Sequence, residues 1–267
     1  MNRKIITIFH NEVALSKETC LCMKEKLEAR GYEVHDHYSE DTDLIVCIGG
    51  DGAFLRAIHR CDFPNCPIVG VNTGHLGFFQ DVLPTDLDQF IDQYESGEYN
   101  LQELNTVRAV VTTVDGHKHT HLALNEITIK GQQSYSVHFS ISNGDQYIAR
   151  FSGDGLILAP SAGSTAYNYS VGGSIADPRL NLLQVTPIAP MNTTAYRSFT
   201  SSILLPADLS LGVVPEQPGN QIFLNNDGFE NAYQNVKNIE VRVSNTSVNL
   251  IRLKGYDFWS KVKDKFL

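Results

Sequence analysis

The order of helix and strand signals along the chain is the sequence feature that most constrains its fold. In the first hundred residues, short β-branched or apolar runs alternate with segments whose apolar residues recur at helical spacing. The run Leu44–Ile48 is apolar throughout, which is typical of a strand buried on both faces of a parallel sheet. Because strands that alternate with helices form wound parallel sheets, we predict an α/β domain over residues 1–103. The expected strands are residues 4–9, 32–34, 44–48 and 67–71, and the expected helices include residues 20–27, 53–59 and 87–94.

After residue 103 the strand signals no longer alternate with helices. Asp115-Gly116 and Asn143-Gly144 each separate two strand-like runs, and both dipeptides are typical of β-hairpin turns. We therefore predict a β-rich second domain over residues 104–253, with one helix at residues 164–171. The amphipathic C-terminal segment, residues 254–267, is expected to pack back onto the first domain. Further expected strands are residues 201–205, 221–224, 239–243 and 248–253.

Composition excludes several classes of partner. The chain has 267 residues, of which 42% are hydrophobic, enough for two domains with cores of their own. Its formal net charge is −9, whereas a nucleic acid-binding protein normally presents a basic face, so we expect no nucleic-acid partner. No apolar run approaches the roughly 18–20 residues that a transmembrane helix needs, so we expect no membrane association.

The cysteines bear on location and on metal binding. There are five, an odd number, and all lie between Cys20 and Cys66. A secreted disulfide framework is more often even and spread along the chain, so we expect a reducing, cytoplasmic location. His59, Cys61 and Cys66 lack the paired spacing of a zinc knuckle, and helix-end or loop thiols are the favoured interpretation. We therefore predict no metal site made of protein ligands.

The segment Gly49-Gly50-Asp51-Gly52 carries the strongest functional signal. It follows a buried strand and precedes an expected helix, and wound sheets bind ligands beyond the carboxyl ends of their strands. Three glycines let backbone N–H groups approach a phosphate, which the start of a helix also favours. A carboxylate among them fits a metal-linked group or a base that accepts a proton from an attacking hydroxyl. The structural alternative is that Asp51 caps the helix. The sequence has no P-loop, no Rossmann glycine motif after the first strand and no protein-kinase motif.

Three more segments combine small residues with polar groups. Residues 70–78 again follow a strand, and Phe78 is either available to stack on a planar base or a core residue. Asn125-Glu126 lies inside a strand-like run, residues 122–130. The pair offers an amide and a carboxylate for the two hydroxyls of a ribose, and an exposed polar pair is the alternative. Both side chains reach one ligand only at a strand end or bulge. Residues 162–168 suit a phosphate or sugar, or form a helix capped by Ser164 or Thr165.

These four segments occur in the order found in bacterial NAD kinases. Gly49–Gly52 alone is shared with diacylglycerol, sphingosine and related lipid kinases, but the four together are specific, and they cover roughly residues 43–200. The chain therefore resembles the ATP-NAD kinase family. The resemblance implies an α/β N-terminal domain, a β-rich C-terminal domain and an active site in the crevice between them. It also implies transfer of the ATP γ-phosphoryl group to the 2′-hydroxyl of the adenosine ribose of NAD, which gives NADP.

The resemblance further implies roles for individual residues. Asp51 would be the base for the 2′-hydroxyl, and Gly49, Gly50 and Gly52 would approach the phosphates of ATP. Mg²⁺ or another divalent metal would be held mainly by the substrate phosphates, and the protein would be a homodimer or homotetramer. Asn125 and Glu126 would hold the adenosine side of NAD. The full set implied in NAD binding is Asn72, Gly74, Phe78, Asn125, Glu126, Asp154, Thr165, Ala166, Tyr167, Ser170, Ala189 and Tyr196.

Three positions depart from the common family pattern. Ala53 stands where a Thr is common, Ala162 removes a hydroxyl next to Gly163, and Ser152 stands where an Arg is frequent. These departures leave the candidate base and the ribose-binding pair in place. They therefore bear on affinity and donor choice more than on the type of reaction.

Two other functions remain open from the sequence. A lipid or other small-alcohol kinase would share the glycine–aspartate loop, but it has no evident use for Asn125-Glu126 or residues 163–168. A non-catalytic dinucleotide-binding sensor is conceivable because of Ala53 and Ala162. Retention of Asp51 argues against a sensor, since the binding of an anionic ligand gains nothing from a carboxylate there.

Overall fold

The computed structural model describes residues 4–132, 135–144, 146–194, 197–217 and 219–266. The chain divides into a first unit, residues 1–103 with residues 247–267, and a second unit, residues 104–246. β5 (Tyr99–Thr113) and β16 (Val236–Leu253) each contribute to both units, because the divisions fall within these strands. Within the described ranges, no helix has the length and apolar character needed to cross a bilayer.

The first unit is built on a parallel sheet. Its strands are β1 (Ile5–His10), β2 (Glu33–His35), β3 (Thr42–Gly49) and β4 (Ile68–Asn72), in the order β2-β1-β3-β4. The C-terminal part of β16 continues this sheet, since Leu250 pairs with Ile68 in parallel. β3 is buried over most of its length, as the apolar run in the sequence predicts. The expected wound parallel sheet is confirmed.

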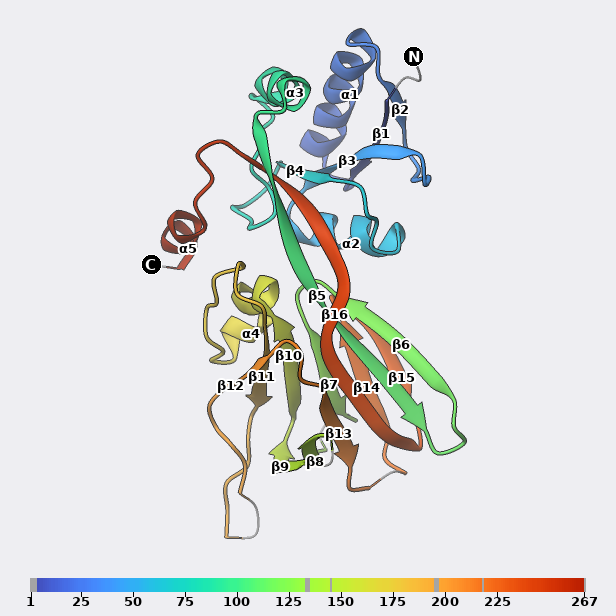
Figure 1. Cartoon of the computed structure of the whole chain (residues 1–267), viewed down its shortest axis with the longest axis vertical. Helices are drawn as coiled ribbons and strands as arrows, with labels where there is room; N and C mark the ends of the chain where they lie inside the picture. Colours follow the sequence, from blue (N-terminus) through green and yellow to red (C-terminus); the bar gives the residue numbers. More distant parts are fainter. Residues whose placement is uncertain (1–3, 133–134, 145, 195–196, 218, 267) are drawn as a thin grey trace. The chain divides into compact units, whose positions relative to one another are not determined.

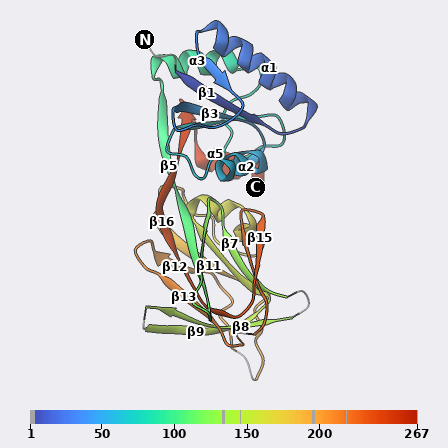
Figure 2. The same cartoon turned by 90° about the vertical axis from the view of Figure 1, so that its right-hand side faces the viewer.

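Helices cover both faces of this sheet (Figures 1 and 2). α1 (Ala14–Ala29) and α3 (Leu87–Ser96) pack on one face, where Met23 and Phe90 join strand residues such as Leu44 in one apolar cluster. α2 (Asp51–Arg60) packs against β3 on the other face, and α5 (Phe258–Phe266) lies on that side as well. After α1, Gly31 has φ +87°, the left-handed conformation expected of a glycine that ends a helix.

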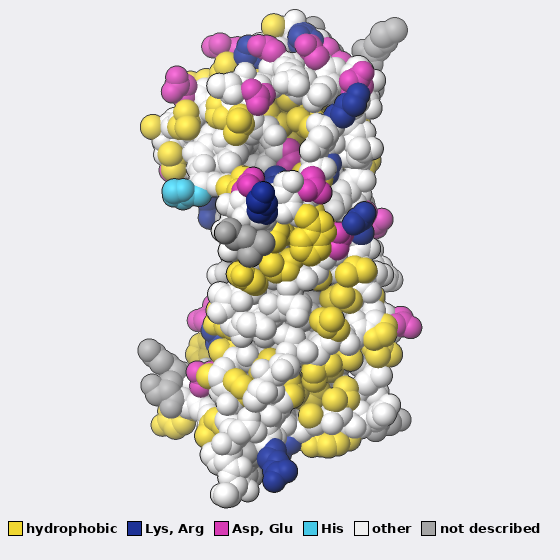
Figure 3. Space-filling model, turned by 90° about the vertical axis from the view of Figure 1, so that its left-hand side faces the viewer, with side chains coloured by type: hydrophobic (Ala, Val, Ile, Leu, Met, Phe, Trp, Pro, Cys, Tyr) yellow, Lys and Arg dark blue, Asp and Glu magenta, His cyan; other side chains and the backbone are white. Residues whose placement is uncertain are grey.

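Charged side chains of both signs are interspersed over the first unit, as the face in Figure 3 shows. Lys26 of α1 and Arg30, the residue that follows this helix, form ion pairs with α3. Lys26 lies 2.7 Å from Asp88, and Arg30 lies 2.7 Å from both Asp92 and Glu95. Because these groups are all partly exposed to solvent, the pairs contribute little to stability, and the apolar cluster beneath them holds the two helices on the sheet.

The second unit is β-rich and contains two sheets of antiparallel strands. The β5–β6 hairpin and the neighbours β16-β13-β8-β9 belong to one sheet, and β12-β11-β10-β7-β14-β15 form the other. Phe139 and Val213 of the first sheet share one apolar cluster with Leu156 and Leu224 of the second, so the two sheets pack face to face. The strands are β6 (Lys118–Ala123), β7 (Ile127–Gly131), β8 (Val137–Asn143), β9 (Gln146–Gly153), β10 (Gly155–Pro160), β11 (Leu182–Ile188), β12 (Ile203–Pro206), β13 (Leu211–Pro215), β14 (Ile222–Asn226) and β15 (Phe229–Tyr233).

The second unit departs from the sequence prediction in three places. The helix expected at residues 164–171 is a 3₁₀ turn, Ser161–Thr165, followed by one short helix, α4 (Tyr167–Ser170). This segment is rich in glycine and short polar residues, which are poor helix formers. The strands expected at residues 239–243 and 248–253 are one continuous strand, β16. The strand-like run at residues 122–130 is divided in two, for a reason given below.

Candidate active site

The glycine–aspartate loop joins β3 to α2 in the first unit. Gly49 has φ +151°, and a side chain there would meet Ala53 at 2.6 Å and the Asn11 amide at 3.0 Å, so the position requires glycine. Gly50 is the N-cap of α2, and a Cβ added to it would find no atom within 4 Å. A Cβ on Gly52 would meet only the end of Arg56, at 3.5 Å. The space beside Gly50 and Gly52 is therefore open, at a helix N-terminus that favours an anion.

Asp51 is the first residue of α2, and its carboxylate does not cap the helix. The helix-capping alternative is therefore wrong. The carboxylate instead accepts hydrogen bonds from the backbone N–H groups of Phe78, at 3.1 and 3.2 Å, and Phe79, at 3.2 Å. Gly77 permits this approach, since a Cβ there would lie 2.5 Å from Asp51 Oδ1. The loop after β4 is thus folded closely around Asp51, and it fixes the orientation of the carboxylate.

The two glycine-containing loops of the first unit lie side by side. Asn72 pairs with Gly49 in the parallel ladder of β3 and β4, so both residues lie at the carboxyl edge of the sheet. Asn72 Oδ1 accepts the backbone N–H of Gly74 at 2.9 Å, which fixes the turn. Thr73 is hydrogen-bonded to Ser16 of α1 at 2.6 Å. The loop is therefore held at both of its sides.

The C-terminal helix packs on the loop that surrounds Asp51. Phe78 is only 6% exposed, and the centre of its ring lies 5.9 Å from that of Phe258 and 5.8 Å from that of Phe266. Lys265 Nζ lies 5.0 Å from the centre of the Phe78 ring and 3.7 Å from Asp51 Oδ2. Stacking of Phe78 on an adenine would require these side chains to move aside, so that contact stays a prediction.

A buried ion cluster ties the C-terminal segment to the same loop. Asp81 accepts hydrogen bonds from Arg252, at 3.0 Å, and Lys261, at 2.5 Å, and Lys261 also donates to the Gln80 carbonyl at 2.6 Å. Burial lowers the pKa of Lys261, while the Asp81 charge opposes this change. Removing one partner would leave an uncompensated buried charge, so the cluster fixes residues 252–261 on the first unit.

Asn125 and Glu126 lie in a break between β6 and β7 of the second unit. Asp227 explains the break. Its carboxylate accepts the backbone N–H groups of Leu124 at 2.7 Å, Asn125 at 2.8 Å and Glu126 at 3.2 Å, which are therefore not available to a strand ladder. The pair thus lies at a strand end, the position from which both side chains are able to reach one ligand.

Glu126 is the most strongly perturbed acid of the expected site. Burial and, second, the charge of Asp227 raise its pKa from the ordinary 4.5 to about 8, against the opposing effect of a hydrogen bond from the Tyr167 backbone. At pH 7 the side chain therefore carries a proton and is both a donor and an acceptor. Its Oε2 is buried without a hydrogen-bond partner among the described residues.

A cavity of about 250 Å³ lies beside Glu126 within the second unit. Tyr167 and Lys130 line it too, and Lys130 Nζ donates to the Tyr167 hydroxyl at 3.1 Å. The cavity therefore brings together the protonated carboxyl group of Glu126, the ring of Tyr167 and the cation of Lys130, and Phe223 and Glu230 line it as well. This combination suits a nucleoside with hydroxyl groups and a planar base.

The segment that contains Gly163 is packed directly against Asn125. A Cβ on Gly163 would overlap the carbonyl of Asn125, so only glycine permits this approach. Thr165 and Ala166 follow and are half-buried. No side chain caps the 3₁₀ turn or α4, so the alternative in which Ser164 or Thr165 caps a helix is wrong. The expected segments around Asn125 and Gly163 are thus adjacent in the second unit.

Other polar residues of this segment have internal partners. Ser164 Oγ forms hydrogen bonds with the backbone of Ala176, at 3.0 and 3.1 Å, and Asn168 accepts one from Thr186 at 2.6 Å. Both Ser164 and Asn168 are fully buried. Ser170, by contrast, is exposed, although its hydroxyl donates to a backbone carbonyl at 2.8 Å. Ser164 and Asn168 therefore support the segment, and a ligand has no access to them.

Asp154 and Ala189 lie together in the second unit. The Asp154 N–H donates to the Ile188 carbonyl at 3.0 Å, and both Asp154 and Ala189 are exposed. Ala189 has φ +44°, an uncommon conformation for a residue with a side chain. Gly153 allows the close approach, since a Cβ there would lie 2.8 Å from the Ala189 carbonyl. Tyr196 lies outside the described residues.

The structure shows the surroundings of two residues that depart from the family pattern, Ala53 and Ser152. Ala53 lies against Gly49, where a Cβ on Gly49 would touch it. Ser152 is 1% exposed and forms hydrogen bonds with His138 and Ser198, each at 2.8 Å. Ser152 is therefore an interior residue of the second unit.

Three residues that contact the expected site segments were not predicted from the sequence. Asp227 precedes Gly228, and this Asp-Gly pair is a readable hairpin signal that the sequence analysis did not use. Asn11 lies against Gly49, and Lys265 lies near Asp51. No local pattern marks either residue, because each contact joins segments that are far apart in the sequence.

Comparisons with known proteins identify the family of the chain. The ATP-NAD kinase N-terminal domain family matches residues 3–99, and the ATP-NAD kinase C-terminal domain family matches residues 124–253. A NAD kinase of Finegoldia magna is 38% identical over 272 residues, which cover 100% of this chain and 99% of that protein. A NAD kinase of Staphylococcus carnosus is 32% identical over 262 residues, with 97% of each chain covered.

Solved structures show the same fold. A crystal structure of yeast NADH kinase complexed with NADH has a TM-score of 0.86 at 18% identity, and covers 99% of this chain and 88% of that one. A NAD kinase from Archaeoglobus fulgidus in complex with ATP has a TM-score of 0.77 at 23% identity, with 97% and 98% covered. Because two family matches together span most of the sequence, and full-length relatives exceed 30% identity, this chain belongs to the NAD kinase family.

Proposed function

We propose that this member of the NAD kinase family transfers the γ-phosphoryl group of ATP to the 2′-hydroxyl of the adenosine ribose of NAD, which gives NADP. The observation that carries the proposal is the setting of Asp51. A carboxylate is held in one orientation by backbone N–H groups, at the start of a helix and between two glycines with open space beside them. Phosphoryl transfer depends mainly on positioning and charge neutralisation, which such a loop supplies.

The first unit would bind the donor phosphates. Gly50 and Gly52 offer backbone N–H groups at the N-terminus of α2, and Gly49 lets the chain turn into that helix. Asn72 and Gly74 flank the same edge of the sheet and would contact the dinucleotide. Mg²⁺, or another divalent metal, would enter bound to the donor phosphates and would neutralise their charge. The open space beside Gly50 and Gly52 fits phosphates that carry a metal.

Asp51 would act as the base. As the 2′-hydroxyl oxygen bonds to the γ-phosphorus and the bond from that phosphorus to the bridging oxygen of ATP breaks, the hydroxyl proton passes to a carboxylate oxygen of Asp51. Each carboxylate oxygen has more than one lone pair, so the hydrogen bonds from Phe78 and Phe79 leave capacity for this proton. ADP and NADP are the products.

The second unit would bind NAD. Protonated Glu126 would donate a hydrogen bond to one ribose hydroxyl, and the Asn125 amide would bind the other. Tyr167, Thr165 and Ala166 would surround the adenine in or near the cavity beside Glu126. Further contacts would come from Phe78, Asp154, Ser170, Ala189 and Tyr196.

We further propose that the protein is cytoplasmic and forms a homodimer or homotetramer. The five cysteines are unpaired, which suits a reducing compartment. The proposal on assembly rests on the family resemblance alone. Light scattering on the purified protein measures the assembly directly, and a monomer at all concentrations would refute it.

One assay separates the proposed function from its two rivals. Purified protein is incubated with ATP, Mg²⁺ and NAD, and NADP is detected with an NADP-specific dehydrogenase. We expect NADP that accumulates in proportion to enzyme concentration. Measurable NAD binding without NADP would favour a dinucleotide sensor. Phosphorylation of a lipid alcohol, with no NADP formed, would favour a lipid kinase.

A further inference from the structure

A buried glutamine beside Asp51 has an amide that the proposed function does not use. Gln80 lies in the loop after β4 and is 3% exposed. Both polar atoms of its amide, Nε2 and Oε1, are buried without a hydrogen-bond partner in the described ranges of the chain. A buried amide that makes no hydrogen bond is costly, so its position needs a reason.

The Gln80 amide lies next to the Asp51 carboxylate. A Cβ added to Gly77 would overlap Gln80 Oε1 and would lie 2.5 Å from Asp51 Oδ1, so the two oxygens border the same small space. Gly77 keeps this space free of a side chain. While Asp51 is ionised, both oxygens are acceptors and form no hydrogen bond with each other. A hydrogen bond forms between the two groups only if one of them presents a donor.

The backbone and the side chain of Gln80 are both held in place. The N–H groups of the two preceding residues donate to Asp51, and the Gln80 carbonyl accepts a hydrogen bond from Lys261 at 2.6 Å. A Cβ on Gly70 of β4 would lie 2.9 Å from both Cα and Cγ of Gln80, so the side chain packs directly on this strand. The amide therefore turns towards solvent only if these contacts break.

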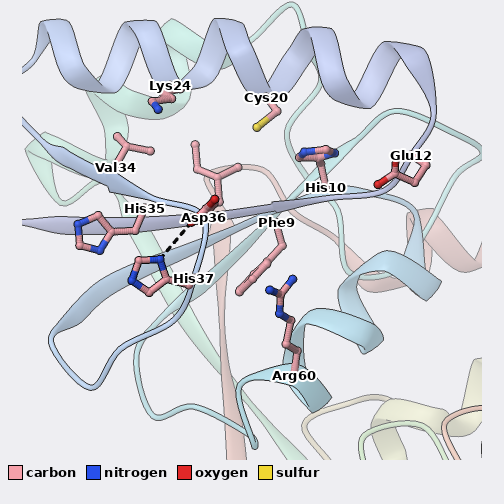
Figure 4. Close-up of a pocket in the computed structure, with 11 residues that line it drawn as sticks. Phe9, His10, Glu12, Cys20, Lys24, Val34, His35, Asp36, His37 and Arg60 are labelled. Atoms are coloured by element: carbon pink, nitrogen blue, oxygen red, sulfur yellow. Dashed lines mark hydrogen bonds and ion pairs between the residues drawn. The ribbon is translucent and has the colours of Figure 1, made fainter.

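The cavity beside β1 does not reach this amide. It has a volume of about 530 Å³ and lies beside residues 8–10 of β1, beyond Thr7, the last residue of β1 that pairs with β2 (Figure 4). Residues such as His10, Lys24 and Arg60 line it, whereas Gln80 and Asp51 do not. Solvent in the cavity is therefore no partner for the amide, and the adjacent Asp51 carboxylate is the group that it is able to bind.

A glutamine amide matches both protonation states of a carboxyl group. Rotation of the amide by half a turn about its terminal torsion exchanges its oxygen and nitrogen. An ionised carboxylate only accepts hydrogen bonds, and the amide nitrogen donates to it. A protonated carboxyl group carries an O–H, and the amide oxygen accepts from it. A base that takes the proton of the 2′-hydroxyl passes through both states in every turnover.

We propose that Gln80 is a positioning residue for the base of the reaction, and that its amide hydrogen-bonds to Asp51 in both protonation states. The inference rests on the proposed function, which makes Asp51 that base. Before phosphoryl transfer, Nε2 donates to the carboxylate and holds it in place for the 2′-hydroxyl. After transfer, the O–H of protonated Asp51 donates to Oε1 as NADP leaves. Because Gln80 is buried, it acts through Asp51 and touches neither substrate.

Gln80→Met tests the inference, because methionine has a similar length and no amide. Gln93→Met is the matched control. Gln93 also has a buried amide oxygen without a partner in the part of the chain that the structure describes, but it lies on α3, across the sheet from α2. In the coupled NADP assay we expect kcat to fall at least tenfold in Gln80→Met and less than twofold in Gln93→Met. The dissociation constant for NAD, measured by calorimetry, should stay within twofold in both.

The same substitution in an Asp51→Asn background shows whether Gln80 acts through Asp51. We expect Gln80→Met to change the residual turnover of Asp51→Asn by less than twofold, because the base that it positions is already absent. A tenfold loss in this background would overturn the proposal. So would an unchanged kcat in Gln80→Met, an equal loss in Gln93→Met, or a loss of NAD binding that matches the loss of kcat.

A spectroscopic measurement does not depend on activity or on how Gln80→Met folds. Proton–nitrogen correlation spectra resolve side-chain NH₂ groups, and selective labelling of glutamine with assignment of the Gln80 and Gln93 signals follows both amides in the folded protein. Asp51→Asn should shift the Gln80 signal and leave the Gln93 signal in place. A Gln80 signal that does not move would contradict a hydrogen bond to Asp51.

The failure of this inference and that of the proposed function are distinguishable. If the unaltered protein makes no NADP from ATP and NAD, the proposed function fails, while the spectra still decide whether Gln80 binds Asp51. If the protein makes NADP, but neither kcat nor the Gln80 signal responds as expected, only the role of Gln80 fails.

Discussion

The protonation state of Glu126 leads to a stability prediction that is specific in sign and size. The ordinary pKa of a glutamic acid side chain, 4.5, is raised to about 8 in the folded protein, mainly by burial and second by Asp227. Glu126→Gln replaces the protonated acid by an amide of nearly the same shape that never ionises. The substitution should therefore change how stability depends on pH, and change stability itself little at low pH.

The sign follows from proton binding. Between pH 4.5 and about 8, Glu126 is ionised in the unfolded chain and protonated in the folded protein, so the folded state binds more protons. The free energy of unfolding therefore falls as the pH rises through this window, and the loss is complete above pH 8. At about 1.4 kcal/mol for each tenfold change in acidity, the loss amounts to about 5 kcal/mol at most.

Urea denaturation at pH 5, 7 and 9 measures this effect. We expect Glu126→Gln to match the unaltered protein at pH 5 and to exceed its stability progressively at pH 7 and 9, by up to about 5 kcal/mol. Glu230→Gln is the control, because Glu230 is an exposed glutamate, on β15 of the same sheet. Parallel pH profiles for Glu126→Gln and the unaltered protein would refute a protonated Glu126.

Three further predictions concern the supports of the site. Gly77→Ala pushes a Cβ onto the Asp51 carboxylate and should lower kcat for NADP formation at least tenfold, as measured in the coupled assay; a loss below twofold would contradict the close fit. Asp227→Asn weakens three hydrogen bonds and should lower the free energy of unfolding, measured with urea, by about 1–3 kcal/mol. It should also weaken NAD binding, measured by calorimetry. Unchanged NAD affinity would show that the break between β6 and β7 needs no carboxylate at this position. Asp81→Asn leaves Arg252 and Lys261 buried without a counter-charge and should cost about 3–5 kcal/mol in the same denaturation experiment, and a change below 1 kcal/mol would show that the cluster does not hold the C-terminal segment.

Local signals in the sequence were sufficient to predict most helices and strands of the first unit. Apolar periodicity located the helices around Met23, Phe54 and Phe90, and the continuous apolar run located β3. These signals suffice because a wound sheet buries each strand between helices, so burial is visible in the residues themselves. The start of α1 at Ala14 was not visible, since its first turn has neither an apolar stripe nor a side-chain cap.

Contacts between residues far apart in the sequence set the parts of the structure that local sequence patterns did not predict. The break at Asn125 depends on Asp227, which lies 102 residues further along the chain. The packing of α5 on Phe78 joins the end of the chain to the loop after β4. The cavity beside β1 depends on where β2 stops, and a strand end has only a weak signal in the sequence. In each case a tertiary partner, and no local propensity, sets the geometry.

The family resemblance located the candidate site more fully than residue chemistry alone. Glycines with open space around them, such as Gly50, look the same in the sequence as glycines that packing requires, such as Gly163. The structure distinguishes the two kinds of glycine by the space around each Cα atom. It also shows that Asp51 binds the loop after β4 and does not cap its helix.

Turnover of Asp51→Asn tests the central claim most directly. Asparagine is able to keep the hydrogen bonds from Phe78 and Phe79 through its side-chain oxygen, but it does not accept the proton of the 2′-hydroxyl. We expect kcat for NADP formation to fall by about 10²–10⁴-fold, while the dissociation constant for NAD and the midpoint of thermal unfolding change little. A variant that binds NAD normally and turns over at more than a tenth of the original rate would show that Asp51 is not the base.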